Sequence, residues 1–446
     1  MSIEGKLVQG EPSRLFPIVA ETNKENRIAS VFLSLLPLLP DLSKALFQSV
    51  SLRIGARSKI QCFSEVVFRS DAEKTNRPDG LIVVANGKKQ WSALVEFKIG
   101  KAELEQEQVE RYLKLARENE INAVITISNQ FVSRADHPPI SVNKNLLKKV
   151  DLFHWSWLSI FTASRLLQLE TQIDTEQKHL LDEFIRFLDH KSTGITGFDQ
   201  MNKGWREVVS AARTGGLLVK SSAEVEATVA GWLEEQRDLS LMLSRIVGKT
   251  VRQKIETKLL KDPNQRLKAE IAKFCKKKLL SAVFQVPDTA SDIKVEADLD
   301  RRTIDVSMSL KAPSDRKSTK ARINWLLRML KTDDARIIVR AHWPSRVGHT
   351  QESLVRLREN PDLIQAQNSK LAPHSFEILL IEPLANRFSG PRTFIEDLER
   401  MVPEFYSLVG QHLRAWQAAA PKPVEPAKGR DKSDETSTVL KLNNPL

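Results

Sequence analysis

The stretch RPDGLIVVANGKKQWSALVEFK, residues 77–98, decides the fold of the first part of this chain. Residues 81–85 (LIVVA) are rich in β-branched and apolar side chains, which is typical of a buried strand. The Asn-Gly pair that follows is a favoured two-residue hairpin turn, and residues 88–98 return as a second strand. The sequence therefore predicts an antiparallel hairpin.

Charged side chains of this hairpin are expected on one face. If the Asn-Gly pair forms the turn, Asp79 lies opposite Leu94 in the register. Because side chains alternate along a strand, Asp79 then shares a face with Glu96 and Lys98, and Glu96 is its diagonal neighbour. A slip of one residue would move Asp79 to the opposite face. We therefore expect two carboxylates and one ammonium group to converge.

Two carboxylates and a lysine in one place indicate a particular chemistry. Close carboxylates repel each other unless a cation lies between them. Mg²⁺ (or Mn²⁺) is typically held by one or two carboxylates, with water and substrate phosphate as further ligands. A lysine beside the metal can orient or help to deprotonate the attacking water and can stabilise charge on the phosphate. Asp79 and Glu96 are the expected metal ligands and Lys98 the expected catalytic lysine of a phosphodiester-hydrolysis site.

Two predicted helices extend this site. Residues 102–118 have helical periodicity, and Gln108 falls in their apolar stripe with Tyr112 one turn further. A buried glutamine is costly unless it finds partners, so we expect Gln108 to face the hairpin and position the water. On the predicted helix 24–38, Glu25 precedes the apolar stripe and can close the metal shell. The alternatives are an exposed Gln108, a Glu25 that only suits the helix dipole, and a solvated charged hairpin face.

These features resemble the PD-(D/E)xK phosphodiesterase superfamily, which has the restriction-endonuclease-like fold. The likeness covers about 25–165 and rests on KEN (24–26), RPDG (77–80), VEFK (95–98), the QxxxY spacing of Gln108 and Tyr112, and the strand AVITIS (123–128). The resemblance implies an αβββαβ core that binds Mg²⁺ and cuts DNA or, less often, RNA. It also implies that Asp79 and Glu96 are metal ligands, that Lys98 is catalytic, that Gln108 is an accessory residue, and that Glu25 is the acidic residue of the first helix.

The element pattern predicts an α/β chain in four parts. Residues 1–170 are the nuclease-like domain, 171–285 a helical basic region, 286–417 an α/β accessory domain and 418–446 a disordered tail. In the accessory domain we expect strands at 292–299, 302–310, 335–343 and 374–383, and helices at 318–331 and 393–417.

Composition narrows the class of protein. The chain has 446 residues and a formal net charge of +12, which favours a polyanionic partner but argues only for non-specific attraction. A run of about 18 uncharged apolar residues is missing, so a membrane span is not expected. The N-terminus lacks the apolar core of a secretory signal. Cys62 and Cys275 are the only cysteines, which excludes a disulfide framework and fits a cytoplasmic location.

Basic clusters lie in the second and third parts. Residues 249–278 hold 11 Lys and Arg residues against three acidic ones, and another cluster surrounds the predicted helix 318–331. Such runs are either solvated helix faces or surfaces that contact phosphates. In the second interpretation they deliver nucleic acid to the first domain. The residues assigned to this contact are Lys276, Lys277, Lys278, Arg322 and Arg328.

The expected function is a metal-dependent nuclease that hydrolyses DNA phosphodiester bonds by metal-activated water. A role in repair, restriction or phage defence follows by analogy of fold alone. The alternatives are a non-catalytic nucleic-acid-binding protein on a nuclease-like scaffold and a protein-interaction component of a larger system. The sequence leaves open DNA or RNA, single or double strands, endo- or exonucleolytic cutting, and the oligomeric state, a homodimer included.

Overall fold

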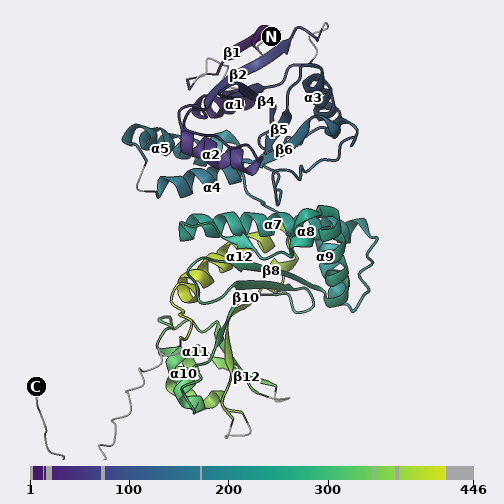
Figure 1. Cartoon of the computed structure of the whole chain (residues 1–446). Helices are drawn as coiled ribbons and strands as arrows, with labels where there is room; N and C mark the ends of the chain where they lie inside the picture. The colour runs from purple at the N-terminus through teal and green to yellow at the C-terminus, as the bar shows by residue number, and fades with distance from the viewer. Residues whose placement is uncertain are drawn as a thin grey trace, which may run out of the picture.

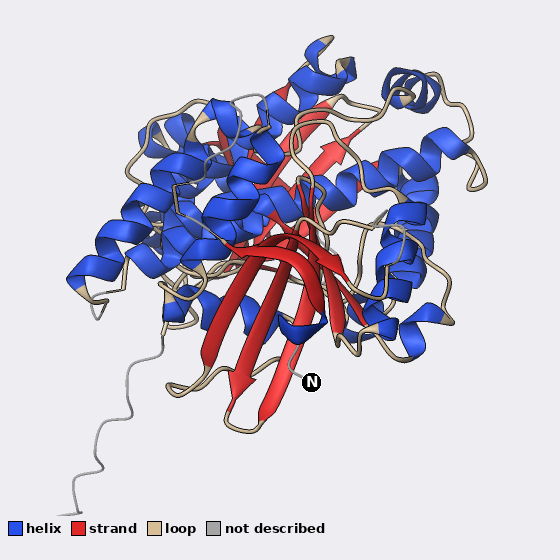
Figure 2. Ribbon diagram, turned by 90° about the horizontal axis from the view of Figure 1, so that it is seen from above, coloured by secondary structure: helices blue, strands red, loops and turns tan. Residues whose placement is uncertain are grey.

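The chain forms two open sheets with helices packed around them (Figure 1). The computed structural model describes residues 4–13, 15–16, 23–71, 76–170, 173–344, 348–366 and 371–417. Viewed from above, helices flank the strands on both sides (Figure 2). The mixed α/β class predicted from the sequence is confirmed. The expected tail at 418–446 lies outside the described residues.

The N-terminal unit contains a six-stranded sheet and five α-helices. Its elements are β1 (Leu7–Pro12), α1 (Lys24–Leu35), α2 (Pro40–Ser49), β2 (Lys59–Phe68), β3 (Gly80–Asn86), β4 (Lys89–Phe97), α3 (Gln106–Glu118), β5 (Ala123–Ser128), β6 (Asp151–Ser156), α4 (Trp157–Gln168) and α5 (Thr175–Asp189). The strands follow one another in chain order across the sheet. Strands β1 to β4 pair antiparallel, whereas β4, β5 and β6 are parallel.

The local sequence explains where the first helices begin. The side chain of Asn23 accepts a hydrogen bond from the amide of Asn26 at 3.2 Å, which caps α1. Pro40 occupies the first turn of α2, where its missing N–H is not needed. Helix α1 therefore ends before the prolines, and α2 begins at Pro40.

The β3–β4 hairpin is present, but its predicted register is wrong. Asn86 pairs with Lys89, so Gly87 and Lys88 are the two turn residues. Gly87 has a φ of +64°, a conformation that glycine adopts without strain, and its position sets the turn one residue later than expected. Leu81, not Asp79, lies opposite Leu94. The shift is by two residues along the partner strand, so each side chain stays on its predicted face.

The two faces of the N-terminal sheet carry separate apolar cores. Val95 and Phe97 face α1, α2, α4 and α5. Leu94 faces α3, where it joins Val109 and Tyr112. Because residues alternate along β4, Glu96 and Lys98 belong to the α3 face. The sheet therefore directs Glu96 and Lys98 toward the face that α3 covers.

The rest of the chain is built on a seven-stranded antiparallel sheet. Its elements are α6 (Trp205–Arg213), α7 (Ala223–Val247), β7 (Arg252–Gln253), α8 (Thr257–Lys261), α9 (Pro263–Lys277), β8 (Leu279–Gln285), β9 (Ile293–Asp298), β10 (Thr303–Lys311), α10 (Thr319–Leu327), β11 (Ile337–His342), β12 (His349–Ser353), α11 (Leu354–Glu359), β13 (Ser375–Pro383) and α12 (Pro391–Phe405). Their order in the sheet is β12-β11-β13-β10-β9-β8-β7. Helix α7 lies across this unit, next to the N-terminal unit (Figure 1).

Core packing divides the chain differently from the expected boundaries. Helix α5, expected in the middle region, packs into the N-terminal core through Leu181, Phe184 and Leu188. Helices α6, α7 and α9 share one continuous core with the second sheet. Strands β7 and β8, in the region expected to be helical, belong to that sheet. A basic amphipathic helix needs an apolar partner, and here the second sheet supplies it.

Among the described residues, no single helix is long and apolar enough to cross a membrane. Helices α1 and α2 reach that length and composition only as a pair, bent by 107°. Both contribute buried residues to the N-terminal core, such as Phe32 and Phe47.

Gly80 begins β3 at a crowded point, and its replacement should disturb the hairpin. A Cβ at this position would lie 2.6 Å from Cδ1 of Leu33, a fully buried side chain of α1. We expect Gly80→Ala to lower the free energy of unfolding by about 1–3 kcal/mol, as overpacking does in other cores. Chemical denaturation measures it. Gly55→Ala, where a Cβ meets nothing within 4 Å, is the matched control. Equal effects of the two changes would contradict this account.

Candidate functional site

The carboxylate of Glu96 is the centre of the candidate site. Glu96 lies near the end of β4 and is only 1 % exposed. Its Oε1 lies 2.8 Å from Nζ of Lys98 and accepts a hydrogen bond from Nε2 of Gln108 at 2.7 Å. Its Oε2 is buried and accepts no hydrogen bond from a nitrogen donor among the described residues, although the side chains of Asp79 and Tyr112 also interact with this carboxylate. One oxygen of this carboxylate is thus held by Lys98 and Gln108, whereas the other receives no hydrogen bond from a nitrogen donor of the described residues.

Asp79 is held beside Glu96 by its backbone and its side chain. Its carbonyl oxygen accepts the amide of Glu65 at 2.9 Å, where a φ of +51° at Glu65 interrupts the regular pairing of β2. Its Oδ2 accepts the amide of Phe97 at 2.8 Å. The observed register places Asp79 one position beyond the Gly80–Val95 pair, and therefore next to Glu96. Asp79 and Glu96 are thus direct rather than diagonal neighbours.

Helix α3 supplies the second wall of the site. Nε2 of Gln108 lies 3.1 Å from the hydroxyl oxygen of Tyr112, one helical turn further. The Tyr112 hydroxyl donates to the carbonyl oxygen of Arg77 at 3.2 Å. Gln108 is half-buried and Tyr112 is buried. Gln108 therefore has hydrogen-bond partners, as expected for a glutamine in the apolar stripe of a helix. One of them is the Glu96 carboxylate itself.

Burial and mutual repulsion perturb the acids of this site. Burial, followed by repulsion from Glu96, raises the pKa of Asp79 well above its usual range. Burial also raises the pKa of Glu96, although Lys98 opposes that shift. For Lys98, burial lowers the pKa, but the contact with Glu96 outweighs it, so the pKa of Lys98 is raised overall. When both acids are ionised, the site therefore carries one more negative charge than Lys98 neutralises.

This donor set fits a hard divalent cation. Glu96 offers an unpartnered buried oxygen, and Asp79 lies beside it with one oxygen engaged by an amide. Carboxylate oxygens are the ligands that Mg²⁺ and Mn²⁺ take in proteins. Burial is the main cause of the raised pKa of Asp79, and the repulsion from Glu96 that adds to it is what such an ion would relieve. Asp79 and Glu96 are therefore the residues that would hold it.

Glu25 lies at the edge of this site rather than in its centre. Its Oε1 accepts the amide of Ile99 at 3.4 Å. Its charge acts on both Asp79 and Lys98. The group of three acids in the described chain whose oxygens lie within 4.8 Å of one another is a different one, so Glu25 does not join Asp79 and Glu96 that closely. Its expected role as a direct metal ligand stays a prediction.

Three further polar residues border the site and were not singled out from the sequence. Asn26 donates from Nδ2 to Oε1 of Glu65 at 2.9 Å. Glu65 also pairs with Arg77 at 3.0 Å. Asn26 stands in the KEN segment and Arg77 in RPDG, so both lay within the quoted motifs. Glu65 gave no such signal, because its importance comes from the interruption in β2.

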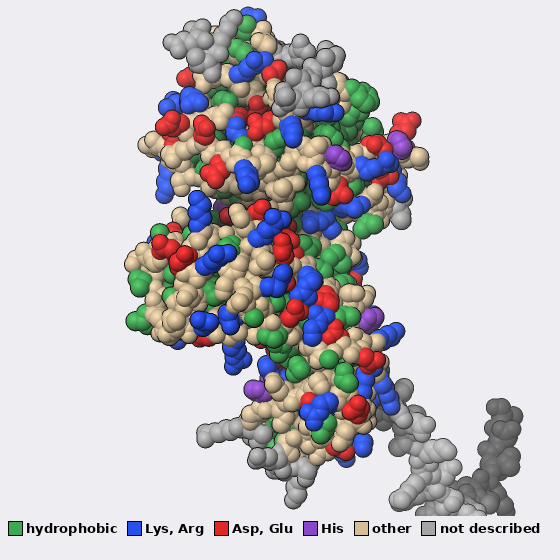
Figure 3. Space-filling model, turned by 180° about the vertical axis from the view of Figure 1, so that it is seen from behind, with side chains coloured by type: hydrophobic (Ala, Val, Ile, Leu, Met, Phe, Trp, Pro, Cys, Tyr) green, Lys and Arg blue, Asp and Glu red, His purple; other side chains and the backbone are tan. Residues whose placement is uncertain are grey.

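Of the five residues predicted to contact nucleic acid, two hydrogen-bond to backbone carbonyl groups and three are exposed. Lys278 donates to the carbonyl oxygen of Ala212 at 2.8 Å, and Arg322 donates to the carbonyl oxygen of Pro373 at 2.7 Å. Both therefore support the fold. Lys276, Lys277 and Arg328 are exposed. On the face shown in Figure 3, Lys and Arg side chains gather along the waist of the molecule and are interspersed with acidic ones.

The raised pKa of Asp79 predicts an unusual effect of its neutralisation. Above the unfolded pKa of about 3.9, an acid with a raised folded pKa makes the native state retain protons that the unfolded chain has lost, so stability falls as pH rises. Asp79→Asn keeps an acceptor for the Phe97 amide. Without divalent metal, we expect it to raise the free energy of unfolding at pH 8 by roughly 1–3 kcal/mol.

Urea denaturation in chelating buffer at several pH values tests this prediction. The gain should shrink as the pH falls toward that of the unfolded carboxyl group. Asp151→Asn, at an exposed position that begins β6, serves as the control and should have little effect. A loss of stability in Asp79→Asn at pH 8 would contradict the charge imbalance described above.

Comparisons with known proteins add no assignment to this geometry. No protein-family model matches the chain, and no curated protein or solved structure matches it either. The chemistry of the site is therefore inferred from its own distances, burial and charges.

Proposed function

We propose that this chain is a metal-dependent nuclease that hydrolyses a phosphodiester bond of DNA at the Asp79–Glu96–Lys98 site. The observation that carries the proposal is the buried Glu96 carboxylate, which contacts Lys98 and Gln108 through one oxygen and has the second carboxyl group, that of Asp79, directly beside it. A structural ion pair would not need the second acid beside it. Apart from α2, which lies between α1 and β2, the chain order α1, β2, β3, β4, α3, β5 also agrees with the αβββαβ order of the restriction-endonuclease-like fold.

Each residue of the site has a role that its surroundings support. A bound Mg²⁺ would supply Lewis-acid stabilisation of the phosphate and a more acidic water. Asp79 and Glu96 would hold that ion through their carboxylates. Gln108 positions Glu96, since its amide donates to Oε1. Through the same amide it also contacts Tyr112, so α3 keeps the carboxylate in one orientation.

Lys98 acts in this proposal as a cation. Its raised pKa keeps the ammonium group charged at neutral pH, so it is poorly suited to remove a proton. A charged ammonium can orient the attacking water and stabilise negative charge that develops on the phosphate. The Lys98 side chain is 16 % exposed, so the residue is not fully enclosed by the protein. The carbonyl oxygen of Lys98 is fixed by Nε1 of Trp157 at 3.0 Å, which holds the end of the strand.

Cleavage of supercoiled plasmid with and without Mg²⁺ tests the proposed activity. We expect Asp79→Ala and Lys98→Ala to lower the rate at least about 100-fold, because each removes a charge that acts in the transition state. Gln108→Ala should lower it about 10- to 100-fold by releasing Glu96. The measurement is the initial rate of nicking and linearisation.

Two variants control this experiment. Gln106→Ala lies on the same helix, is exposed, and removes only a hydrogen bond to Glu110. Lys101→Ala removes an exposed lysine three residues beyond Lys98. Both should cleave at the wild-type rate. Absent Mg²⁺-dependent cleavage in the wild type, or cleavage that persists in Asp79→Ala and Lys98→Ala, would leave a non-catalytic nucleic-acid-binding protein as the better description.

The exposed basic residues give a separate prediction about binding. If Lys276, Lys277 and Arg328 contact phosphates, the triple change to Ala should reduce the slope of log K against log salt by up to about three, roughly one per lost contact. Lys44→Ala, on exposed α2 surface, should leave the slope unchanged. Fluorescence anisotropy with labelled duplex at several salt concentrations measures it. A slope that does not change in the triple variant would remove these residues from the DNA contact.

A further inference from the structure

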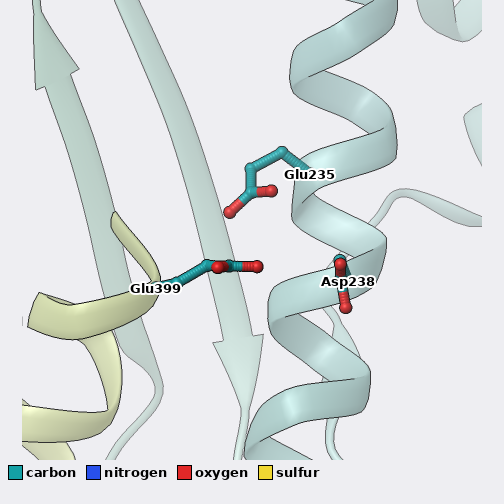
Figure 4. Close-up of side chains that lie close together, drawn as sticks. All are labelled: Glu235, Asp238 and Glu399. Atoms are coloured by element: carbon teal, nitrogen blue, oxygen red, sulfur yellow. The ribbon is translucent and has the colours of Figure 1, made fainter. Parts of the chain in front are cut away.

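A second group of acids lies far from the Asp79–Glu96 pair in the sequence and on other elements. Glu235 and Asp238 come from α7, and Glu399 comes from α12 (Figure 4). One carboxylate oxygen of each lies within 4.8 Å of the others. Residues 235 and 238 are three apart, so the helix presents both on neighbouring positions of one face. Helix α12 brings the third acid from the opposite side.

The carboxylate of Glu235 is buried and lacks any hydrogen-bond partner in the described part of the chain, which points to a ligand. It is fully buried, with 0 % of its surface exposed. Neither of its carboxylate oxygens has a hydrogen-bond partner among the described residues. In Figure 4 its carboxylate points away from α7 toward Glu399. A buried carboxylate without any partner is costly, and most buried polar groups in proteins are paired.

The positive charges nearby do not pair with these acids. Arg245 acts on Asp238 and Glu399 electrostatically, but its guanidinium donates to Oγ1 of Thr162 at 2.8 Å and lies over the ring of Phe161. Arg237 acts on Asp238 as well, and its Nε is buried without a partner. Asp199 and Glu396 add further negative charge beside Glu399. Among the ion pairs of the described chain, none includes a member of this triad.

The chain makes room for the triad and gives access to it. Oδ2 of Asp238 accepts the amide of Phe198 at 2.8 Å, which leaves its other oxygen for a ligand. A Cβ on Gly197 would lie 2.4 Å from the same Oδ2, so only glycine lets this segment pass so close. A cavity of about 610 Å³ reaches Asp238 and Glu399. An ion and its water ligands can therefore enter from that side.

We propose that Glu235, Asp238 and Glu399 bind a hard divalent cation that links α7 to α12. The ligands are carboxylate oxygens only, which suits Mg²⁺, Mn²⁺ or Ca²⁺ and not the metals that require thiolate or imidazole. Three carboxylates, a divalent ion and the two arginines sum to a charge of +1, and the negative charges of Asp199 and Glu396 act against this remainder. The ion ties together α7, α12 and the 197–199 segment, which leads from the N-terminal unit. This site is independent of the proposed nuclease activity.

Counting bound Mn²⁺ by electron paramagnetic resonance tests the proposal in the full chain. The background is Asp79→Asn with Glu96→Gln, which removes the acids of the first site. That background should bind one Mn²⁺ per chain. Adding Glu235→Gln should abolish the binding, whereas adding Glu226→Gln, an exposed acid of the same helix, should leave it unchanged. Glu399→Gln, at a partly exposed position, should weaken binding at least about 10-fold.

A second measurement keeps the test decisive if Glu235→Gln folds poorly. Mn²⁺ at 100 times its Kd multiplies the folded-to-unfolded ratio about 100-fold, so it should raise the Tm of the background variant. Chelator should reverse the shift. A background variant that binds no Mn²⁺ and gains no Tm would overturn the proposal. So would retained binding in Glu235→Gln and Glu399→Gln. Neither result bears on plasmid cleavage, because the first site is removed throughout.

Discussion

The contact between the Glu96 carboxylate, the Lys98 ammonium and the Gln108 amide is the constraint on which the candidate site depends. A carboxylate that is almost fully buried requires compensation, and it receives it from β4 itself and from α3. The hydrogen bond between Gln108 and Glu96 links α3 to β4. Two apolar side chains at these positions would have been enough for packing. The second carboxylate, Asp79, makes the arrangement electrostatically unfavourable without a cation, since burial and Glu96 both raise its pKa. A bound cation would relieve this repulsion, so the unfavourable arrangement of the two acids favours cation binding.

The two faces of the N-terminal sheet differ: one carries apolar packing, and the other also carries the charged residues of the candidate site. The face toward α1, α2, α4 and α5 is apolar and holds the aromatic residues Phe32, Phe97 and Trp157 in mutual contact. The face toward α3 carries the charged ends of the hairpin beside a smaller core. Alternation along β4 makes this division possible, because Phe97 anchors the strand while its neighbours Glu96 and Lys98 point toward the site. Rigid strands hold catalytic groups more exactly than loops can.

The second acidic group follows the same physical logic in another part of the chain. Among the described residues, Glu235 is buried without a partner, and of the two arginines that act on Asp238, Arg245 is held by Thr162 and Phe161 while Arg237 has a buried Nε without a partner. Buried charge at a junction between α7 and α12 is weak evidence for stability by itself. It is better explained by a ligand that completes it. The chain would then hold two hard cations with different purposes, one at a reactive hairpin and one between helices.

The sequence by itself determined the hairpin, the shared face of Asp79, Glu96 and Lys98, and the inward position of Gln108, because strand and helix periodicity are local properties. The turn predicted from the sequence lay one residue too early, because both an Asn-Gly and a Gly-Lys turn satisfy the local preferences, and the structure pairs Asn86 with Lys89. Tertiary structure alone decided that α6, α7 and α9 share a core with the second sheet. The proximity of Glu399 to Glu235 and Asp238 was also decided by tertiary structure alone. Contacts between distant segments depend on which surfaces pack together, and local sequence patterns do not reveal this.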